Sequence, residues 1–253
     1  RSKQNKLGKD NNEEARGIKT EIKSIEPQLE EIEKKLKELL LQVPNIPFDD
    51  VPVGKDDSQN VVMKKIGKTP YFKFKPKDYM DIAEGLNLID TKRAAKVAGT
   101  RFGYIKKEAA LLEFGLIKLG LDILAKEKFI PILPPVMLKS QMAKGTGYFE
   151  STDEKEAYFF PEDDLYLVGT SEQSLIAMHA DEIFNEKELP RRYVGFSTCF
   201  RREAGSYGKD TKGILRVHQF DKLEMVSFCK PEDSKKEHQL LLSLEEKLMK
   251  SLK

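Results

Sequence analysis

The sequence predicts an α+β protein, in which a helical N-terminal segment is followed by a core of antiparallel strands and packing helices. Three features of the sequence support this prediction. Within residues 18–43, apolar positions recur at alternating spacings of four and three, which is the heptad pattern of a coiled coil. Residues 192–203 and 215–228 alternate in polarity around a glycine-containing loop, as the two strands of an antiparallel hairpin do. Residues 108–128 and 231–253 have the length and the apolar periodicity of helices.

The overall charge and the rare residue types exclude several classes of function. The chain has 44 basic and 42 acidic side chains, and this net charge of +2 predicts no strong bulk attraction to nucleic acid. Any contact with RNA must therefore come from a local patch. The three histidines have no metal-ligand spacing with the two cysteines, so no protein-held metal site is expected. No stretch is long and apolar enough to span a bilayer, so no membrane partner is expected either.

The two cysteines bear on the cellular compartment. Cys199 and Cys229 lie in strand-like apolar surroundings, which is typical of reduced structural thiols. The basic start of the sequence also lacks the apolar core of a leader peptide. Both observations predict a cytoplasmic protein.

The first predicted domain, residues 1–43, is a helical segment. Pro27 falls between the positions of the heptad seam and is expected to kink the helix, because it removes a backbone hydrogen bond. The polar run from Gly8 to Glu14 is predicted to be a turn that follows a short stub of an earlier helix. A seam without a partner is unstable, so a dimerising coiled coil is the ordinary interpretation. The seam consists of Ile18, Ile22, Ile25, Leu29, Ile32, Leu36, Leu39 and Val43.

Residues 44–60 are rich in proline and aspartate and are predicted to be an extended linker to a core domain, residues 61–253. Early in that core, residues 79–85 and 90–98 predict two short helices. Residues 100–106 predict a strand.

The middle of the core contains two further strands. A strand within residues 129–138 that ends at Pro135 would belong at a sheet edge or an interface, because proline cannot donate in a ladder. Residues 165–168 predict a short strand. The helix that follows is expected to run through His179 and to begin with a capping box formed by Thr170 and Gln173.

The hairpin carries the candidate functional residues. Side chains alternate between the two faces of a strand, so one face of each run is largely apolar and the other is polar. A cationic face beside an aromatic ring suits a nucleotide, because arginine binds phosphate, the ring stacks on the base and a carboxylate accepts from an exocyclic amine. An ordinary amphipathic hairpin with a solvated polar face would show the same alternation. The polar set comprises Ser197, Cys199, Arg201, Glu203, Arg216, His218, Phe220, Lys222 and Glu224.

The amino-acid sequence of the hairpin distinguishes these alternatives. The run FRREAGSYGKDTKGILRVHQFDKLE resembles the second signature motif of class II aminoacyl-tRNA synthetases, in the form found in seryl-tRNA synthetases. The family pattern is Phe-Arg-x-Glu, which matches residues 200–203, then Arg-Val-His-Gln-Phe at 216–220 and Lys-x-Glu at 222–224. Prolyl and threonyl enzymes share Arg-x-Glu but not Arg-Val-His-Gln-Phe. The family fold is an antiparallel sheet flanked by helices.

The resemblance implies an ATP-dependent ligase that converts L-serine to seryl-adenylate and transfers it to tRNA(Ser), with use of tRNA(Sec) left open. Arg201 would be the catalytic residue, because it would bridge the serine carboxylate and the α-phosphate. Mg²⁺ would accompany ATP, and His218 is expected to make only a structural hydrogen bond. The implied ATP contacts are Arg201, Arg202, Glu203, Arg216, Val217 and Phe220, and the implied serine contacts are Thr170, Ser171, Glu172, Arg201 and Glu224.

The same resemblance implies that residues 1–43 are part of the tRNA-binding helical arm and that residues 129–138 build a homodimer interface. The family's third motif has no counterpart in the sequence. The chain is therefore expected to be a fragment, without the start of the arm and the C-terminal region, and to be inactive alone. Two alternatives remain: an inactive, synthetase-like binding or regulatory protein, and a paralogue that passes the activated amino acid to an acceptor other than tRNA.

Overall fold

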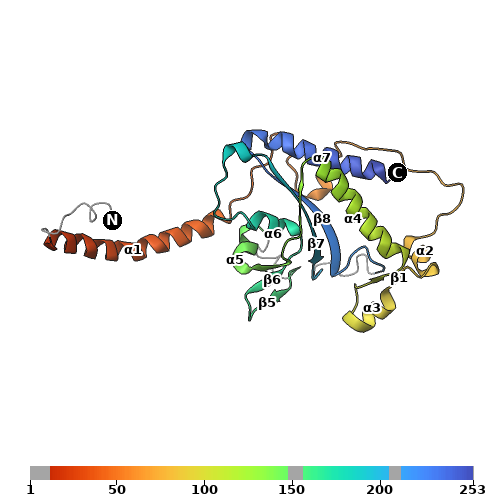
Figure 1. Cartoon of the computed structure of the whole chain (residues 1–253), viewed down its shortest axis with the longest axis horizontal. Coiled ribbons are helices and arrows are strands. Elements are labelled where there is room, and N and C mark those ends of the chain that lie inside the picture. Colours follow the sequence, from red (N-terminus) through yellow and green to blue (C-terminus); the bar gives the residue numbers. More distant parts are fainter. Residues whose placement is uncertain (1–11, 148–155, 205–211, 253) are drawn as a thin grey trace. The chain divides into compact units, whose positions relative to one another are not determined.

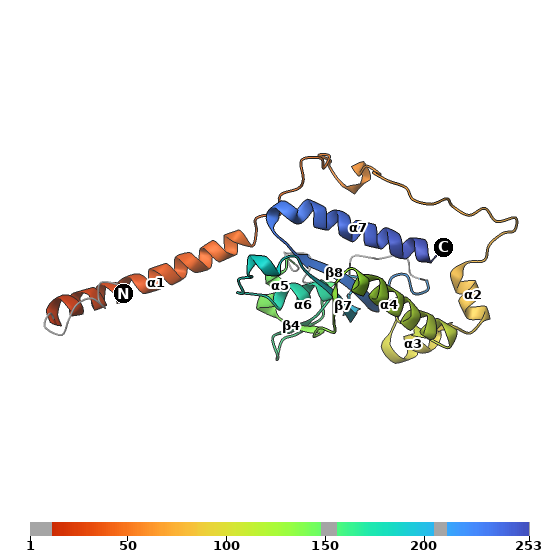
Figure 2. The same ribbon diagram turned by 45° about the horizontal axis from the view of Figure 1, so that its top comes forward.

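The structure, a computed structural model, describes residues 12–147, 156–204 and 212–252, with side chains described from residue 15 onward. The chain divides into two units, residues 1–62 and 63–253. Figures 1 and 2 show the ribbon from two directions. Among the helices of the described residues, none is long and apolar enough to cross a membrane.

The first unit is dominated by one helix, α1 (Asn12–Leu40), which continues through Pro27. The predicted turn at residues 8–14 is wrong for residues 12–14, because they already belong to α1; residues 8–11 and the helical stub before them lie outside the described residues. The seam positions from Ile18 to Leu39 lie on α1, whereas Val43 follows the end of the helix; the later members are largely exposed, with Leu29 at 50% and Ile32 at 62%. After α1 the chain is irregular, apart from a 3₁₀ turn at Asp57–Gln59.

The second unit is built around a three-stranded sheet of β3 (Ile130–Ile132), β7 (Arg191–Phe200) and β8 (Gln219–Phe228), in the order β3-β7-β8. β3 is parallel to β7, and β7 is antiparallel to β8. The predicted hairpin is therefore confirmed. Its strands are shorter than predicted, because they end at Phe200 and restart at Gln219.

One face of this sheet is covered by α4 (Glu108–Lys126) and α7 (Ser234–Ser251), which lie on the same side of the hairpin in both views. Val194 of β7 is fully buried in the cluster that these helices form with the sheet. The apolar parity predicted for both strands is thereby confirmed, because burying apolar area is the main favourable term in folding. The cluster comprises Leu124, Phe129, Val194 and Leu244, with Leu223 and Met225 packed against it.

The opposite face of β7 is covered by the short helix α6 (Ser171–Ala177). Gly195 allows this close approach, because a Cβ there would lie 2.8 Å from a methyl carbon of Leu175. The expectation that Ser197 and Cys199 belong to an open polar face is wrong, since they are only 4% and 0% exposed beneath the helix. The alternation of side chains predicts correctly that Ser197 and Cys199 share one face of β7, but it does not predict which element covers that face.

A smaller sheet lies beside α6. It consists of β4 (Met137–Lys139), β6 (Leu165–Leu167) and β5 (Phe159–Phe160), with α5 (Ser140–Gly145) after β4. The strand predicted to end at Pro135 ends earlier, at Ile132 (β3), and residues 129–138 also contain the start of β4, which belongs to a different sheet. Pro134 and Pro135 separate them, because proline has no N–H to continue a ladder. The edge position predicted for this segment is confirmed for β3.

The remaining elements precede α4. The helix α2 (Tyr79–Gly85) has the predicted bounds, and α3 (Thr91–Ala98) begins one residue later than predicted because Asp90 is its N-cap. The strand predicted over residues 100–106 is reduced to β2 (Tyr104–Ile105), paired with β1 (Ile89–Asp90). The last helix is preceded by a 3₁₀ turn at Pro231–Asp233, so it starts at Ser234 rather than at residue 231.

The helix α7 is joined to the hairpin by a buried ion pair. Glu237 of α7 is 4% exposed, and its carboxylate accepts two hydrogen bonds from the Arg192 guanidinium, at 2.8 and 2.6 Å. The hydroxyl of Ser227 donates a third, at 2.7 Å. These contacts fix the last helix against both strands, since Arg192 lies on β7 and Ser227 on β8.

Candidate active site

The candidate site begins where β6 leads into α6. Thr170, which is fully buried, is the N-cap of this helix, and its hydroxyl accepts a hydrogen bond from the backbone N–H of Glu172 at 3.3 Å. The predicted capping box is modified. In a standard capping box the side chain of Gln173 would accept from the backbone N–H of Thr170. Here it accepts instead from the backbone N–H of Gly169, one residue earlier, at 3.0 Å.

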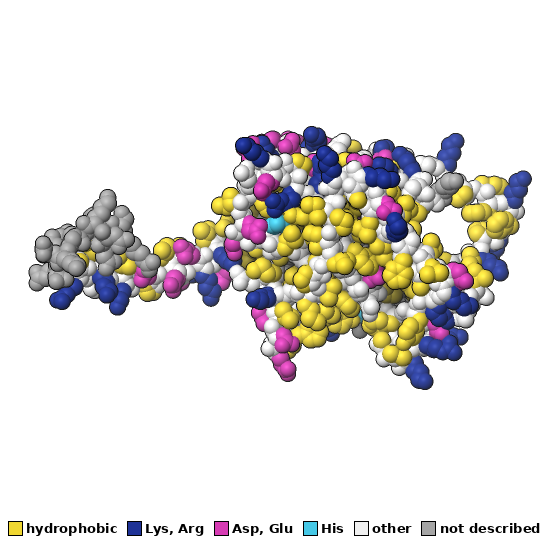
Figure 3. Space-filling model, in the orientation of Figure 1, with side chains coloured by type: hydrophobic (Ala, Val, Ile, Leu, Met, Phe, Trp, Pro, Cys, Tyr) yellow, Lys and Arg dark blue, Asp and Glu magenta, His cyan; other side chains and the backbone are white. Residues whose placement is uncertain are grey.

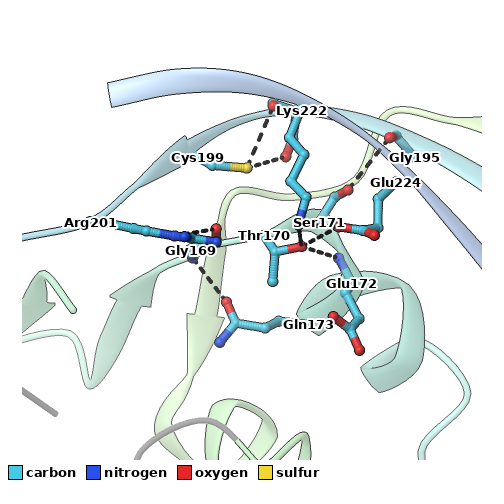
Figure 4. A network of polar contacts seen from close by, with 11 residues as sticks. Gly169, Thr170, Ser171, Glu172, Gln173, Gly195, Cys199, Arg201, Lys222 and Glu224 are labelled. Atoms are coloured by element: carbon cyan, nitrogen blue, oxygen red, sulfur yellow. Dashed lines mark hydrogen bonds and ion pairs between the residues drawn. The ribbon is translucent and has the colours of Figure 1, made fainter. Parts of the chain in front are cut away.

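The Thr170 hydroxyl also meets two side chains of β8 (Figure 4). It donates to Oε2 of Glu224 at 2.5 Å and accepts from Nζ of Lys222 at 3.0 Å. Lys222 and Glu224 are themselves paired at 2.5 Å. The polar face of the hairpin is thus connected directly to the start of α6, by residues that are 52 and 54 positions apart in the sequence.

The structure brings Thr170, Glu172 and Glu224 of the predicted serine set together at this junction. Glu172 lies in the first turn of α6 and is half-buried. Ser171 is placed differently: it is fully buried, and its hydroxyl donates to the carbonyl of Gly195 at 3.4 Å. Its side chain therefore fastens α6 to β7.

Arg201 lies just beyond the end of β7, beside the same junction. Its Nε donates to the carbonyl of Gly169 at 3.3 Å, and its guanidinium carbon lies 5.2 Å from the centre of the Phe220 ring. A cation over an aromatic face is attracted by the ring quadrupole. A cationic and an aromatic side chain of the predicted ATP set therefore lie together. Figure 4 shows Arg201 on one side of Thr170 and Glu224 on the other.

Glu203 and Arg216 face each other across the connection between the strands. Their ion pair measures 2.7 Å, with the Glu203 side chain 12% exposed and that of Arg216 38% exposed. Glu203 has a φ of 53°, which is uncommon for a residue with a Cβ and often marks functional or turn positions. Two residues of the predicted ATP set are thus partners of each other.

Arg202 and Val217, also predicted to contact ATP, lie beside this pair. The guanidinium carbon of Arg202 is 5.8 Å from the centre of the Tyr158 ring, and its backbone N–H donates to Glu156. Val217 is half-buried. The structural role predicted for His218 is confirmed, because its Nδ1 lies 2.9 Å from the carbonyl oxygen of Arg201 and its backbone N–H donates to Arg101.

Two observations concern reactive and metal-binding chemistry. Burial raises the pKa of the Cys199 thiol, so this cysteine beneath the site stays protonated and is a poor nucleophile.

Within the described ranges, no group of three or more His, Cys, Asp or Glu could hold a metal ion. The carboxylates of Glu203 and Glu224 are each paired with a cationic side chain, so these residues do not fit a protein-held Mg²⁺ site.

Sequence reasoning gave Lys222 no role, although the structure places it at the centre of the junction. The signal was available, because Lys222 shares the parity of Phe220 and Glu224 on β8. The sequence does not show that Thr170 contacts the polar face of the hairpin. On a hairpin whose polar face is solvated, a lysine at position 222 would need no partner within the protein.

The chain resembles known proteins over most of its length. Residues 158–252 match the model of the tRNA synthetase class II core domain (G, H, P, S and T). The serine--tRNA ligase of Acidothermus cellulolyticus is 47% identical over 213 residues, which are 84% of this chain and 50% of that protein. The chain therefore spans about half the length of the curated relatives it matches.

Two solved structures resemble the fold closely. Seryl-tRNA synthetase from Pyrococcus horikoshii, complexed with ATP, superposes with a TM-score of 0.85 at 38% identity, over 98% of this chain and 61% of that one. Cytoplasmic serine-tRNA ligase from Naegleria fowleri, in complex with AMP, gives a TM-score of 0.82 at 31% identity, over 93% and 56% of the two chains.

Proposed function

We propose that this chain, which carries a class II tRNA synthetase core similar to that of seryl-tRNA synthetases, is part of an enzyme that activates L-serine with ATP and charges tRNA(Ser). The observation that carries the proposal is the junction at which Thr170, Lys222 and Glu224 meet beside Arg201 and Phe220. This junction supports the proposal because carboxylate acceptors that suit an amino acid lie next to an arginine and an aromatic ring that suit a nucleotide. Two free cysteines suit the cytoplasm.

The amino acid would bind at the start of α6. Carboxylates attract an ammonium and accept from a hydroxyl, and Glu172 and Glu224 provide one on each side of Thr170. Serine has both groups. Its carboxylate would point towards Arg201, which is anchored on the carbonyl of Gly169.

ATP would lie along the connection between the strands. Phe220 offers a ring for the adenine, Glu203 an acceptor for its amine, and Arg216 a charge for the terminal phosphates. Because Glu203 and Arg216 are now paired at 2.7 Å, ATP would separate them and take both as partners. Mg²⁺ would enter on the phosphates of ATP, where this ion usually binds.

The reaction needs positioning and charge neutralisation more than covalent chemistry. The serine carboxylate would attack the α-phosphorus in line, and pyrophosphate would leave. Arg201 would contact both reacting groups, and its fixed charge would stabilise the negative charge that gathers on the α-phosphate oxygens. The adenylate would then pass to the terminal ribose of tRNA.

Arg201→Ala in the full-length protein tests this assignment. We expect serine-dependent ATP–pyrophosphate exchange to fall on the order of 10²-fold, or about 3 kcal/mol, as when one preorganised donor is removed from a charge-stabilising site. Folding should change little, because Arg201 is exposed. Arg191→Ala, at the other end of β7, is the matched control and should leave exchange intact. An unchanged rate in the Arg201 variant would show that the hairpin is not the nucleotide platform.

Residues 1–43 would serve tRNA rather than activation. Within the first unit, α1 has an apolar seam that is exposed from Ile25 onward, and a helix of this kind needs a helical partner. We infer that residues 1–43 belong to an antiparallel arm that contacts tRNA(Ser).

Deleting residues 1–40 from the full-length protein should therefore abolish most tRNA charging and leave ATP–pyrophosphate exchange within about twofold. The reason is that the unit is joined to the core through an irregular connector that contains only one 3₁₀ turn. Parallel assays of charging and exchange measure the effect. If exchange falls as steeply as charging, the segment supports the core fold, and the arm assignment is wrong.

A homodimer would form through the segment of residues 129–138 and the neighbouring helix α4. Hydrophobic side chains gather on the face of the second unit seen in Figure 3. Several on α4, on β3 and just after β3 are highly exposed, and apolar surface exposed in this way supports an interaction site. The exposed side chains include Leu111 at 71%, Leu112 at 62%, Phe114 at 67%, Ile130 at 53% and Leu133 at 81%.

A further inference from the structure

Lys222 occupies the centre of the polar junction between β8 and α6. Its Nζ lies 3.0 Å from the hydroxyl oxygen of Thr170 and 2.5 Å from Oε2 of Glu224 (Figure 4). The Lys222 side chain is 32% exposed and that of Glu224 20%, whereas Thr170 is fully buried. The ammonium is thus held between a buried hydroxyl and a partly shielded carboxylate.

These contacts determine the direction in which the Thr170 hydroxyl points. A hydroxyl has one proton and two acceptor positions. The Lys222 ammonium and the backbone N–H of Glu172 can only donate, so they occupy both acceptor positions. The one hydroxyl proton must therefore go to Oε2 of Glu224, at 2.5 Å.

The same contacts make the two carboxylate oxygens of Glu224 different. Oε2 receives the Thr170 hydroxyl and the Lys222 ammonium. For Oε1, no partner is recorded among the residues that the structure describes. The ammonium also favours the negative charge of the carboxylate, because opposite charges at this distance attract strongly where water is partly excluded.

We propose that Lys222 is a positioning residue that sets selectivity for a hydroxyl-bearing amino acid. By holding Oε2 of Glu224 and orienting Thr170, it presents Oε1 as the one fixed acceptor for the hydroxyl of the substrate. Without the ammonium, the Glu224 side chain can rotate and the Thr170 proton can turn elsewhere. The site then loses its preference for a ligand that donates. This inference rests on the proposed activation of serine and deepens it.

The test uses the full-length protein with Lys222→Met, which keeps the chain length and removes the charge, and Lys222→Arg, which keeps the charge. The matched control is Lys230→Met. Lys230 follows β8, is also 32% exposed and is also paired with a glutamate, Glu186, but lies outside the site. ATP–pyrophosphate exchange is measured against serine, alanine and ATP concentration.

For Lys222→Met we expect at least a tenfold higher KM for serine and a fall of about 100-fold in the preference for serine over alanine, because an unpaired buried acceptor no longer penalises alanine. The KM for ATP should stay within about twofold. Lys222→Arg should recover part of the selectivity. Combining Lys222→Met with Thr170→Val should cost no more than the worse single change, because contacting residues act as a unit.

Each result decides a separate question. An active wild type with unchanged selectivity in both Lys222 variants overturns the inference alone. A KM for ATP that rises as much as that for serine also overturns it, because Lys222 would then contact the nucleotide. A wild type that activates no serine overturns the proposed function and this inference together. If Lys222→Met does not fold, the inference is tested with Lys222→Arg, by its preference for serine over alanine and by its KM values for serine and ATP.

Discussion

Full-length protein should prefer serine to alanine by roughly 10⁴-fold in ATP–pyrophosphate exchange, and Glu224→Gln should lose most of its serine activation while still binding ATP. A site built to accept a hydrogen bond from a hydroxyl leaves buried polar groups unpaired when that hydroxyl is missing. Glu224 accepts from Thr170 and pairs with Lys222, so its carboxylate is already held for this purpose. A glutamine would place an NH₂ donor against Lys222 or against the ligand.

Threonine is the informative third substrate. It keeps the hydroxyl and adds one methyl group, which a pocket discriminates by only about 1–3 kcal/mol. We therefore expect threonine to be rejected less than alanine is. Glu188→Gln, at an exposed ion pair near the start of β7, is the control and should leave all three rates unchanged. Activation of alanine within tenfold of serine by the wild type would mean that Glu224 reads no hydroxyl.

Glu237→Ala should destabilise the second unit by about 3–5 kcal/mol, because removing one member of a buried ion pair leaves the other charge uncompensated. The carboxylate is 4% exposed and receives two bonds from Arg192 and one from Ser227. Chemical denaturation measures the loss. Glu245→Ala, on the exposed side of the same helix, is the control and should change stability by less than about 0.5 kcal/mol. Equal unfolding midpoints in the two variants would contradict the expectation.

The same ion pair predicts how stability depends on pH. Hydrogen bonds from Arg192 lower the pKa of Glu237 below its ordinary value of 4.5. A lowered folded-state pKa gives stability that is complete above the unfolded pKa and is lost as the pH falls through the folded one. Wild type should therefore lose more stability than Glu237→Gln between pH 5 and the acid limit of the folded state. If the free energy of unfolding changes with pH equally in the two proteins over that interval, the ion pair does not contribute to the pH dependence of stability.

The type of fold and the family resemblance can be read from local features of the amino-acid sequence. Heptad spacing, strand alternation and helix caps are local signals, so the hairpin, α2 with its bounds of Tyr79–Gly85 and the α+β class could be predicted. The resemblance of residues 200–224 to seryl-tRNA synthetases is likewise confirmed by the relatives and structures that the chain matches. These features depend on residues that are close together in the chain.

What each face of the hairpin contacts depends on packing between segments that are far apart in the sequence. Parity placed Ser197 and Cys199 on the polar face, but α6 covers them because Gly195 leaves room for its close approach. Parity also placed Lys222 correctly, yet its partner Thr170 is 52 residues away and begins a different element. Side-chain alternation is a property of one strand, whereas burial and hydrogen bonding depend on which distant segment packs against it, and packing brings such segments together without a periodic signal in the sequence.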